Sequence, residues 1–290
     1  MKKQLAIKWL VLLIGVLALT AASAGLFYAH PGESYPYTNH RGETVMMNGH
    51  GLYFYDTVSS AAQAQGNDLV TLLVGVPLLL ISAWLSFRGS LRGRLLLTGT
   101  LGFFLYTYMS MACLAAFNAL FLVYAAIFGL SLYAFILSML SFDLKTLPRA
   151  FTNRFPRAWI AGLIFLVGGF LLLAWLGRIV PPLFQNRTPA LENTTTLVIQ
   201  FMDLGLIVPL AFLSGVLLLL RNPWGYLLSS IMLTKSITLG LGVSAMAVNM
   251  ARAGVPDSLG VMIPFLAITL LNLVMVALML RSVESRAISR

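Results

Sequence analysis

Two charged residues stand inside long apolar stretches of the sequence, where an isolated charge is costly. Asp203 lies in VIQFMDLGLIVPL and Lys235 lies in SSIMLTKSITLG. Either charge near the centre of a bilayer costs about 3 kcal/mol unless a partner or water compensates it. Such a pair has two possible roles: a buried link that fixes helix packing, or a charged pair that lines a cavity for an ion, a proton or a small solute.

The expected geometry does not bring the two charges into direct contact. Asp203 and Lys235 fall on successive antiparallel helices, at depths that differ by about 5–10 Å. Helical side chains lean toward the N-terminus of their own helix, which here separates them further. We therefore expect water or a third polar group to complete the contact.

Three amides accompany the charged pair as candidate residues of the same cavity. Gln200, Asn118 and Asn249 all fall within or at the edge of apolar stretches. Amides in membrane helices commonly bind a neighbouring helix by hydrogen bonds. Each amide therefore has a packing role as the alternative to lining the cavity.

An aromatic face runs along the third and fourth apolar stretches. Tyr106, Tyr108, Tyr124 and Tyr133 recur there, and they either pack together or line a pocket for an apolar ligand. The single cysteine, Cys113, lies in the same region and is expected to be a small buried side chain.

The stretch 29–67, an expected extracytoplasmic loop, holds every histidine of the chain. His30, His40 and His50 are ten residues apart in a segment rich in Gly and Pro. Zinc and copper sites need ligands whose spacing makes them converge. Nothing local brings these histidines together. They are weak candidates for metal ligands, and no metal centre is expected.

The second part of this loop is more orderly. Residues 57–65 are rich in Ala and predict a short helix on the outer surface, ended by Gly66 and Asn67. Asp68 would then begin the second span, where a helix N-terminus favours a carboxylate. The candidate functional residues of this segment are Tyr53, Tyr55, Asp56 and Asp68.

Composition decides the class of protein. Hydrophobic residues make up 59% of the 290, charged residues only 10%, and the mean hydropathy is +0.89. Soluble domains carry about a quarter charged residues, and a helix crosses the bilayer in about 20 apolar residues. The sequence therefore predicts an all-α, polytopic transmembrane bundle in the lipid bilayer, with eight spans at roughly 7–28, 68–87, 95–114, 117–141, 158–180, 197–220, 226–249 and 259–280.

The net charge of +10 indicates orientation rather than a nucleic-acid partner. Basic residues of short loops gather on the cytoplasmic side of membrane proteins. On one side of the expected spans lie Lys2, Lys3, Lys8, Arg88, Arg92, Arg94, Lys145, Arg149, Arg154, Arg157, Arg221, Arg281, Arg286 and Arg290. The other side has only Arg41, Arg178, Arg187 and Arg252. This predicts an inner-membrane (plasma-membrane) protein with both termini in the cytoplasm.

The single membrane domain, 1–290, contains matching intervals that suggest an internal duplication. Trp9 to Pro31 and Trp159 to Pro181 both span 22 residues, and the intervals 77–93 and 209–225 both run from Pro to Gly over 16 residues. We interpret 1–142 and 157–281 as two parallel four-helix repeats. The alternative is chance, since Trp and Pro commonly mark membrane interfaces.

The first span has a second interpretation. MKKQLAIKWLVLLIGVLALTAASAG also has the basic start, apolar run and small residues of a signal peptide. The duplication favours a permanent helix, because the first span then has a counterpart in the fifth.

Part of the chain resembles a family of uncharacterised prokaryotic multi-pass membrane proteins. The resemblance rests on GLYFYDTV…QGNDLVTLLVGVPLLL, RGSLRGRLLLTGTLGFFLYTY and FNALFLVYAAIFGLSLYA, about residues 50–135. It implies a membrane location and no particular activity.

Motifs for catalysis are missing from the sequence. It has no His-Glu metalloprotease motif, no paired intramembrane aspartates and no nucleotide loop. We therefore expect no cofactor, and an intramembrane enzyme is the least favoured of three hypotheses. The leading hypothesis is a membrane protein that binds or moves a small solute or ion near Asp203 and Lys235. The alternative is a non-transporting sensor or scaffold that acts through its outer loop.

Overall fold

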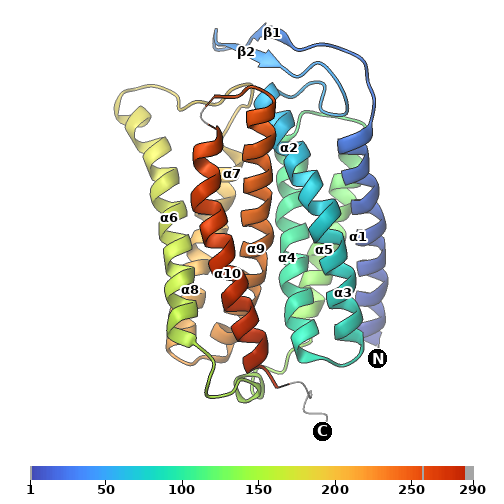
Figure 1. Ribbon diagram of the computed structural model, residues 1–290, viewed down its shortest axis with the longest axis vertical. Helices are drawn as coiled ribbons and strands as arrows, with labels where there is room; N and C mark the ends of the chain where they lie inside the picture. The colour runs from blue at the N-terminus through green and yellow to red at the C-terminus, as the bar shows by residue number, and fades with distance from the viewer. Residues whose placement is uncertain (1, 257, 285–290) are drawn as a thin grey trace.

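The chain folds as an all-α bundle whose long helices run side by side (Figure 1). The structure is a computed structural model that describes residues 2–256 and 258–284. Within that part, eight helices are long and apolar enough to cross a membrane, which confirms the expected multi-pass helical class. Two counted basic residues, Arg286 and Arg290, lie outside the described residues.

Six of the eight spans are single helices and two are composite. The single helices are α1 (Lys2–Phe27), α4 (Leu91–Leu114), α5 (Phe121–Met139), α6 (Arg157–Phe184), α9 (Pro223–Arg252) and α10 (Met262–Ser282). The composite spans join α2 (Val58–Val70), η1 (Thr71–Gly75) and α3 (Val76–Phe87), and α7 (Val198–Met202), η3 (Asp203–Ile207) and α8 (Val208–Leu219). The remaining elements are the hairpin β1 (Tyr35–Thr38) and β2 (Thr44–Met47) and two short 3₁₀ helices, η2 (Leu147–Ala150) and η4 (Ser258–Val261).

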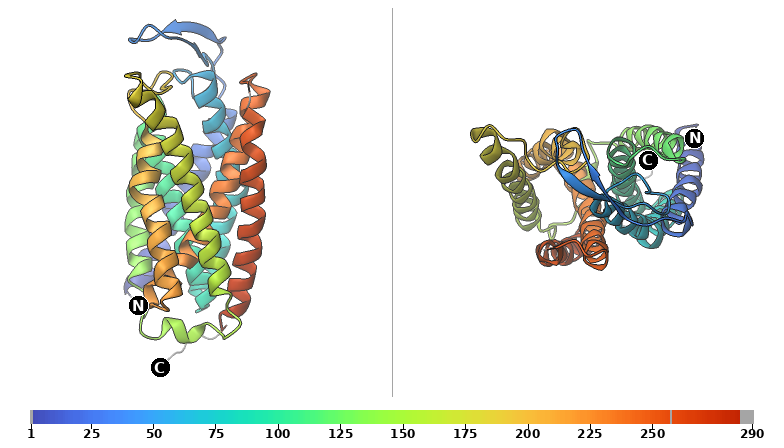
Figure 2. Two further views of the ribbon diagram at one scale, coloured as in Figure 1. Left: turned by 90° about the vertical axis from the view of Figure 1, so that its left-hand side faces the viewer. Right: turned by 90° about the horizontal axis from the view of Figure 1, so that it is seen from above.

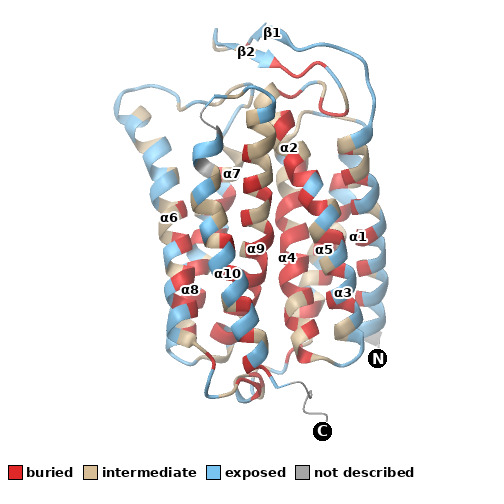
Figure 3. Ribbon diagram, viewed as in Figure 1, coloured by how far each residue is buried: buried red, intermediate tan, exposed pale blue. Residues whose placement is uncertain are grey.

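The buried part of the molecule is centred on α4 and α9. These two spans are the most buried, and Figure 3 shows them as the reddest helices. The outer helices carry many exposed large apolar side chains, including Leu122, Trp159 and Leu173. Such a surface would be unfavourable in water and suits contact with lipid.

The spans fall into two groups of four that meet along α4 and α9 (Figure 2, right). The first half holds α1, α2–η1–α3, α4 and α5, and the second half holds α6, α7–η3–α8, α9 and α10. In addition, α2 packs closely against α9, so the halves share an extended interface.

Segments 71–87 and 203–219 have the same local architecture. Each begins with a five-residue π-helical segment and continues as a twelve-residue α-helix with Pro at its second position. Proline has no N–H and a π segment shifts the hydrogen-bond pattern, so both devices leave backbone carbonyls without a helical partner. Ser82 and Ser214, which lie at equivalent places, each donate to the carbonyl three residues earlier.

The turns that follow these segments are also alike. Gly89 and Arg221 both have positive φ, at +83° and +58°. Four residues later, a Cβ added at Gly93 or Gly225 would meet backbone atoms at 2.5 Å or 2.2 Å. Each turn therefore needs a glycine where the next helix passes the end of the previous one.

The helix of the second span begins about ten residues earlier than expected. Thr57 caps its N-terminus by accepting the Ser60 N–H at 3.1 Å, and α2 continues through Gly66 and Asn67. A Cβ at Gly66 would lie 2.6 Å from the backbone nitrogen of Met246. The expectation of a separate surface helix ending at Gly66 was wrong, because this glycine serves the close contact between α2 and α9.

Candidate functional site

Asp203 is a buried carboxylate held by two aromatic donors. The Tyr106 hydroxyl donates to Oδ1 at 2.7 Å, and the Trp175 Nε1–H donates to Oδ2 at 2.8 Å. The three residues come from η3, α4 and α6, so the site crosses the interface between the two halves. Because both oxygens accept a hydrogen bond, two neutral donors stabilise the carboxylate directly.

Lys235 reaches the same tyrosine from α9. Its Nζ lies 3.9 Å from the centroid of the Tyr106 ring, a geometry in which the ring face attracts a cation. Lys235 makes no ion pair with Asp203, since the one ion pair among the described residues joins Arg41 to Glu43. Tyr106 is therefore the third polar group that connects the two charges.

The ammonium group of Lys235 has unused hydrogen-bonding capacity. The residue is 6% exposed, and among the hydrogen bonds of the described chain its Nζ donates none. An ammonium carries three donors, and a buried charge needs compensation.

The three candidate amides lie in different places. Gln200 is buried on α7, one turn outward of Asp203. Asn249 donates to the Ala62 carbonyl at 3.4 Å and so connects α9 to α2. Asn118 donates to the Ala116 carbonyl and accepts the Leu120 N–H, so it shapes the loop before α5. Only Gln200 lies near the charged pair along the chain.

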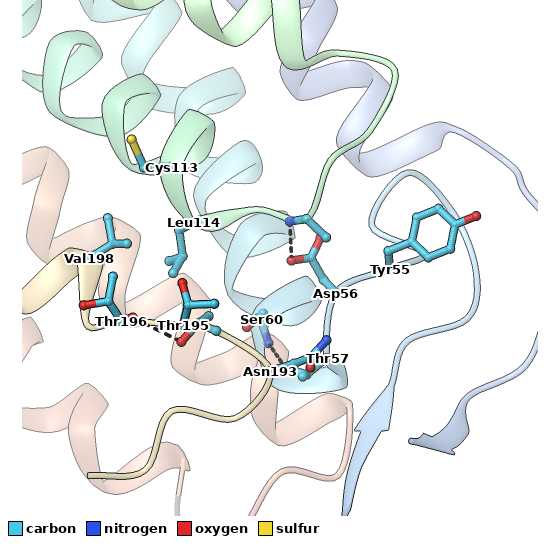
Figure 4. Close-up of a pocket in the computed structure, with 12 residues that line it drawn as sticks. Tyr55, Asp56, Thr57, Ser60, Cys113, Leu114, Asn193, Thr195, Thr196 and Val198 are labelled. Atoms are coloured by element: carbon cyan, nitrogen blue, oxygen red, sulfur yellow. Dashed lines mark hydrogen bonds between the residues drawn. The ribbon is translucent and has the colours of Figure 1, made fainter. Parts of the chain in front are cut away.

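A cavity opens at the end of the bundle that carries the hairpin, which we call the outer end, and we call this cavity the outer vestibule (Figure 4). It has a volume of about 250 Å³ and forms where the ends of α2, α4 and α7 meet. Polar and apolar groups contribute about equally to its lining, which consists of Tyr55, Asp56, Thr57, Ser60, Cys113, Leu114, Ala116, Asn193, Thr194, Thr195, Thr196 and Val198. Cys113 is exposed here, contrary to the expectation of a buried cysteine.

The floor of the vestibule lies close above the Asp203 site. Val198 precedes Asp203 by five residues on the same span, and Cys113 follows Tyr106 by seven on α4. At 1.5 Å per residue these offsets are about 8 Å and 10 Å along the helix axes. The outer vestibule and the contact between Asp203 and Tyr106 therefore share the same two spans, while Lys235 reaches the site from α9.

The vestibule contains one buried carboxylate, Asp56. Its Oδ1 accepts the Ala116 N–H at 3.0 Å, which connects the outer segment to the end of α4. Burial raises the pKa of Asp56 to about 6, while the bond from Ala116 acts in the opposite direction. Tyr55, by contrast, is 62% exposed and packs its ring edge-on against Phe54.

Asp68 does not begin a helix but lies deep in α2. It is 2% exposed, and its Oδ2 accepts the hydroxyl of Tyr53 at 2.5 Å. A Cβ added at Gly25 of α1 would lie only 1.8 Å from that oxygen. Tyr53 is buried as well. Its burial is the main cause that raises the pKa of its hydroxyl, and the neighbouring Asp68 is the second cause. The prediction that Asp68 begins the second span was wrong, because α2 starts at Val58.

The outer hairpin connects the two halves above the vestibule. Asn39 donates to the Glu192 carbonyl at 2.8 Å, and Arg41 donates to the carbonyls of Glu192 and Thr194. Thr57 also donates to the side chain of Glu192. We call residues 35–47 the strap, because they tie the first outer loop to the loop before α7.

The histidines take separate places in this outer region. His30 packs edge-on against Phe54 at 5.0 Å, His40 lies 3.3 Å from Arg41, and His50 Nδ1 lies 2.8 Å from the Asn48 carbonyl. No group of three or more His, Cys, Asp or Glu in the described chain could hold a metal ion.

Comparison with protein family models, curated proteins and solved structures finds no match to this chain. The resemblance of residues 50–135 to uncharacterised prokaryotic membrane proteins therefore stays a prediction. The function has to be argued from the site itself.

Proposed function

We propose that this is an inner-membrane protein that binds, and moves, a small polar solute beside Tyr106, with Asp203 and Lys235 as the charged groups of the site. The observation that carries the proposal is Lys235, which as a residue is 6% exposed at the interface of the halves and whose Nζ donates no hydrogen bond in the described structure. A solute oxygen, from a carboxylate or a carbonyl, is the partner that such a group needs.

A pure packing link accounts less well for this geometry. A link between two buried charges is stable when they pair directly and their remaining donors and acceptors are satisfied. Here the two oxygens of Asp203 bind Tyr106 and Trp175, and Lys235 only lies over a ring face. The lysine is thus the unsatisfied member of the pair.

We also propose that the two halves, 1–142 and 157–281, arose by duplication. The π segments, the prolines, the buried serines and the turns recur 132 residues apart (71 to 203, 77 to 209, 82 to 214, 89 to 221). Transporters built from repeats place their substrate sites at the interface of the repeats. The position of Tyr106 and Lys235 on α4 and α9 agrees with that pattern.

The direction of access is part of the same proposal. Both termini lie at one end of the bundle and the hairpin at the other (Figure 1). Most basic residues of the loops and terminal segments lie at the end of the bundle where the chain starts and finishes. Their excess there supports that end as the cytoplasmic side. The outer vestibule then opens away from the cytoplasm.

A sensor or scaffold is the second candidate. The observation in its favour is the strap, whose Asn39 and Arg41 bind the loop of the opposite half. An ordered outer element of this kind offers a surface to another protein.

The test uses purified protein in detergent and the variants Lys235→Met and Asp203→Asn. Thermal stability is measured against a series of small carboxylates and amides, and native mass spectrometry identifies retained solutes. A solute present at a free concentration 100 times its Kd raises the free energy of unfolding by about 2.7 kcal/mol. We expect Lys235→Met to stay folded and to lose this stabilisation.

Two outcomes would contradict the proposal. If Lys235→Met only lowers stability and no solute stabilises the wild type, the pair is a packing link. If the double variant with apolar residues at both positions is stable and binds the same solute equally well, the site lies elsewhere.

A further inference from the structure

The first half contains a second buried carboxylate, Asp68, which has no basic partner. The titratable groups that face it are Tyr53 from the outer loop, Tyr108 from α4 and Tyr124 from α5. Helix α1 faces it with the backbone of Gly25. No basic side chain of the described chain pairs with this carboxylate.

Hydroxyl groups without partners surround the same position. Among the described residues, buried polar side-chain atoms without a hydrogen bond include Tyr108 Oη, Tyr124 Oη and Thr71 Oγ1. The rings of Tyr108 and Tyr124 are 6.0 Å apart, and Thr71 follows Asp68 by one helical turn. An unmade bond costs about 1–3 kcal/mol for each buried group, so a cluster of three needs an explanation.

This cluster reaches the outer vestibule. Tyr124 neighbours Tyr53 and Asp68 on one side and Asp56 on the other. Asp56 lines the vestibule, and its Oδ2 is a further buried oxygen without a hydrogen bond. Because the pKa of Asp56 is about 6, this carboxyl both binds and releases a proton near neutral pH.

The second half differs by having its own fixed cation. There Asp203 lies near the ammonium of Lys235, whereas the residue 132 positions before Lys235 is Phe103. Asp68 therefore depends on a mobile cation. The three hydroxyl oxygens expose no surface to water, which leaves room for a bare proton and not for a hydrated metal ion.

We propose that Asp68 is a proton-binding site that exchanges with the outer vestibule through Tyr53, whose hydroxyl donates to it at 2.5 Å, and through Tyr124, which neighbours Tyr53 and Asp56. In each transfer a hydroxyl oxygen accepts one proton while its own proton passes on, so one proton moves and the hydroxyl is unchanged. The Tyr53 hydroxyl passes its proton to the Asp68 carboxylate and takes one from Tyr124. Asp56 resupplies Tyr124 when side-chain rotation brings into contact the Asp56 Oδ2 and the Tyr124 Oη, which make no hydrogen bond in this structure. The evidence for this proton site comes only from the buried cluster of the first half. Any coupling between this proton and solute movement rests on the proposed function.

Infrared difference spectroscopy of the full chain in lipid vesicles tests the site directly. The wild type should show the carbonyl band of a buried, protonated carboxyl group, and Asp68→Asn should lose it. Asp203→Asn is the matched control and should keep the band, even if the solute site proposed for Asp203 does not exist. If Asp68→Asn does not fold, Tyr53→Phe should instead shift the band, because its hydroxyl no longer donates to Asp68.

The path is tested by the exchange of this proton for deuterium from outside. Tyr124→Phe keeps the ring and removes the hydroxyl, so exchange should slow several-fold. Tyr133→Phe, an exposed tyrosine of the same helix, should exchange as the wild type does. The inference is overturned if the band survives in Asp68→Asn, if replacing K⁺ by Na⁺ removes it, or if Tyr124→Phe exchanges at the wild-type rate.

Discussion

At the scale of single residues, Tyr106 stabilises two opposite charges without being charged itself. Its hydroxyl donates to Asp203 and its ring face lies under Lys235. A desolvated cation over an aromatic ring gains about 2 kcal/mol, and a hydrogen bond to a charged group contributes about 1.5–3 kcal/mol. One neutral side chain thereby substitutes for a direct ion pair.

Only part of this site could be predicted from the sequence. Asp203 and Lys235 were predictable because a charge in an apolar stretch is conspicuous. Tyr106 and Trp175 were not, because an aromatic residue in a membrane helix has the same sequence signature whether it packs or donates. The one available signal was that a buried Trp N–H usually has a partner, and Trp175 has Asp203.

Tyr106→Phe tests the shared role. The ring under Lys235 remains while Asp203 loses one of its two donors, so the free energy of unfolding should fall by about 1–2 kcal/mol. The measurement is reversible unfolding in mixed detergent micelles. Tyr133→Phe, which removes an exposed hydroxyl, should change stability by less than about 0.5 kcal/mol. Equal stability of Tyr106→Phe and the wild type would mean that the bond to Asp203 contributes nothing.

At the scale of elements, local sequence and tertiary contact disagree in the second span. The pair Gly66 and Asn67 predicted the end of a helix, and Asp68 was therefore predicted to start the next helix. In the fold, Gly66 allows α9 to approach and the helix continues. The buried position of Asp68 depends on α1, α4 and α5, which surround it from distant parts of the sequence, and no local pattern contains that information.

Asp56 connects two elements, the outer segment and the end of α4, and it makes stability depend on pH. Its folded pKa of about 6 lies above the ordinary value of about 4. As pH rises, the Asp56 carboxyl therefore loses its proton at a lower pH in the unfolded chain than in the folded protein. The contribution of Asp56 to the free energy of unfolding falls as pH rises from about 4 through about 6. Asp56→Asn keeps the acceptor for Ala116 and removes the titration.

The expected result is a pH-dependent gain for Asp56→Asn. Its thermal midpoint should match the wild type near pH 4 and exceed it at neutral pH, by an amount that corresponds to about 1–3 kcal/mol. Asp143→Asn, which replaces an exposed carboxylate in the loop between α5 and α6, is the control and should not show this gain at neutral pH. A difference that is the same at both pH values would show that Asp56 does not titrate as described.

At the scale of the whole molecule, hydropathy predicted the number of spans but not how they meet. Each span is long and apolar in its own right, so its existence is a local property. The outer vestibule joins residues 55–60, 113–116 and 193–198, and Tyr106 meets Lys235 across the two halves. These contacts follow from the packing of α4 against α9, for which the sequence offers only the weak signal of matching intervals.

A solute that reaches the Lys235 site from the outer vestibule needs a path that a small thiol reagent can also follow, so thiol accessibility tests for this path. Cys113 is the single cysteine of the chain and lines the vestibule, so a small membrane-impermeant thiol reagent applied outside should label the wild type. In a Cys113→Ala background, Lys235→Cys should also be labelled from outside in the folded protein, more slowly than Cys113. If the thiol at position 235 reacts only after denaturation, while Cys113 reacts readily, the site is sealed and the account is wrong.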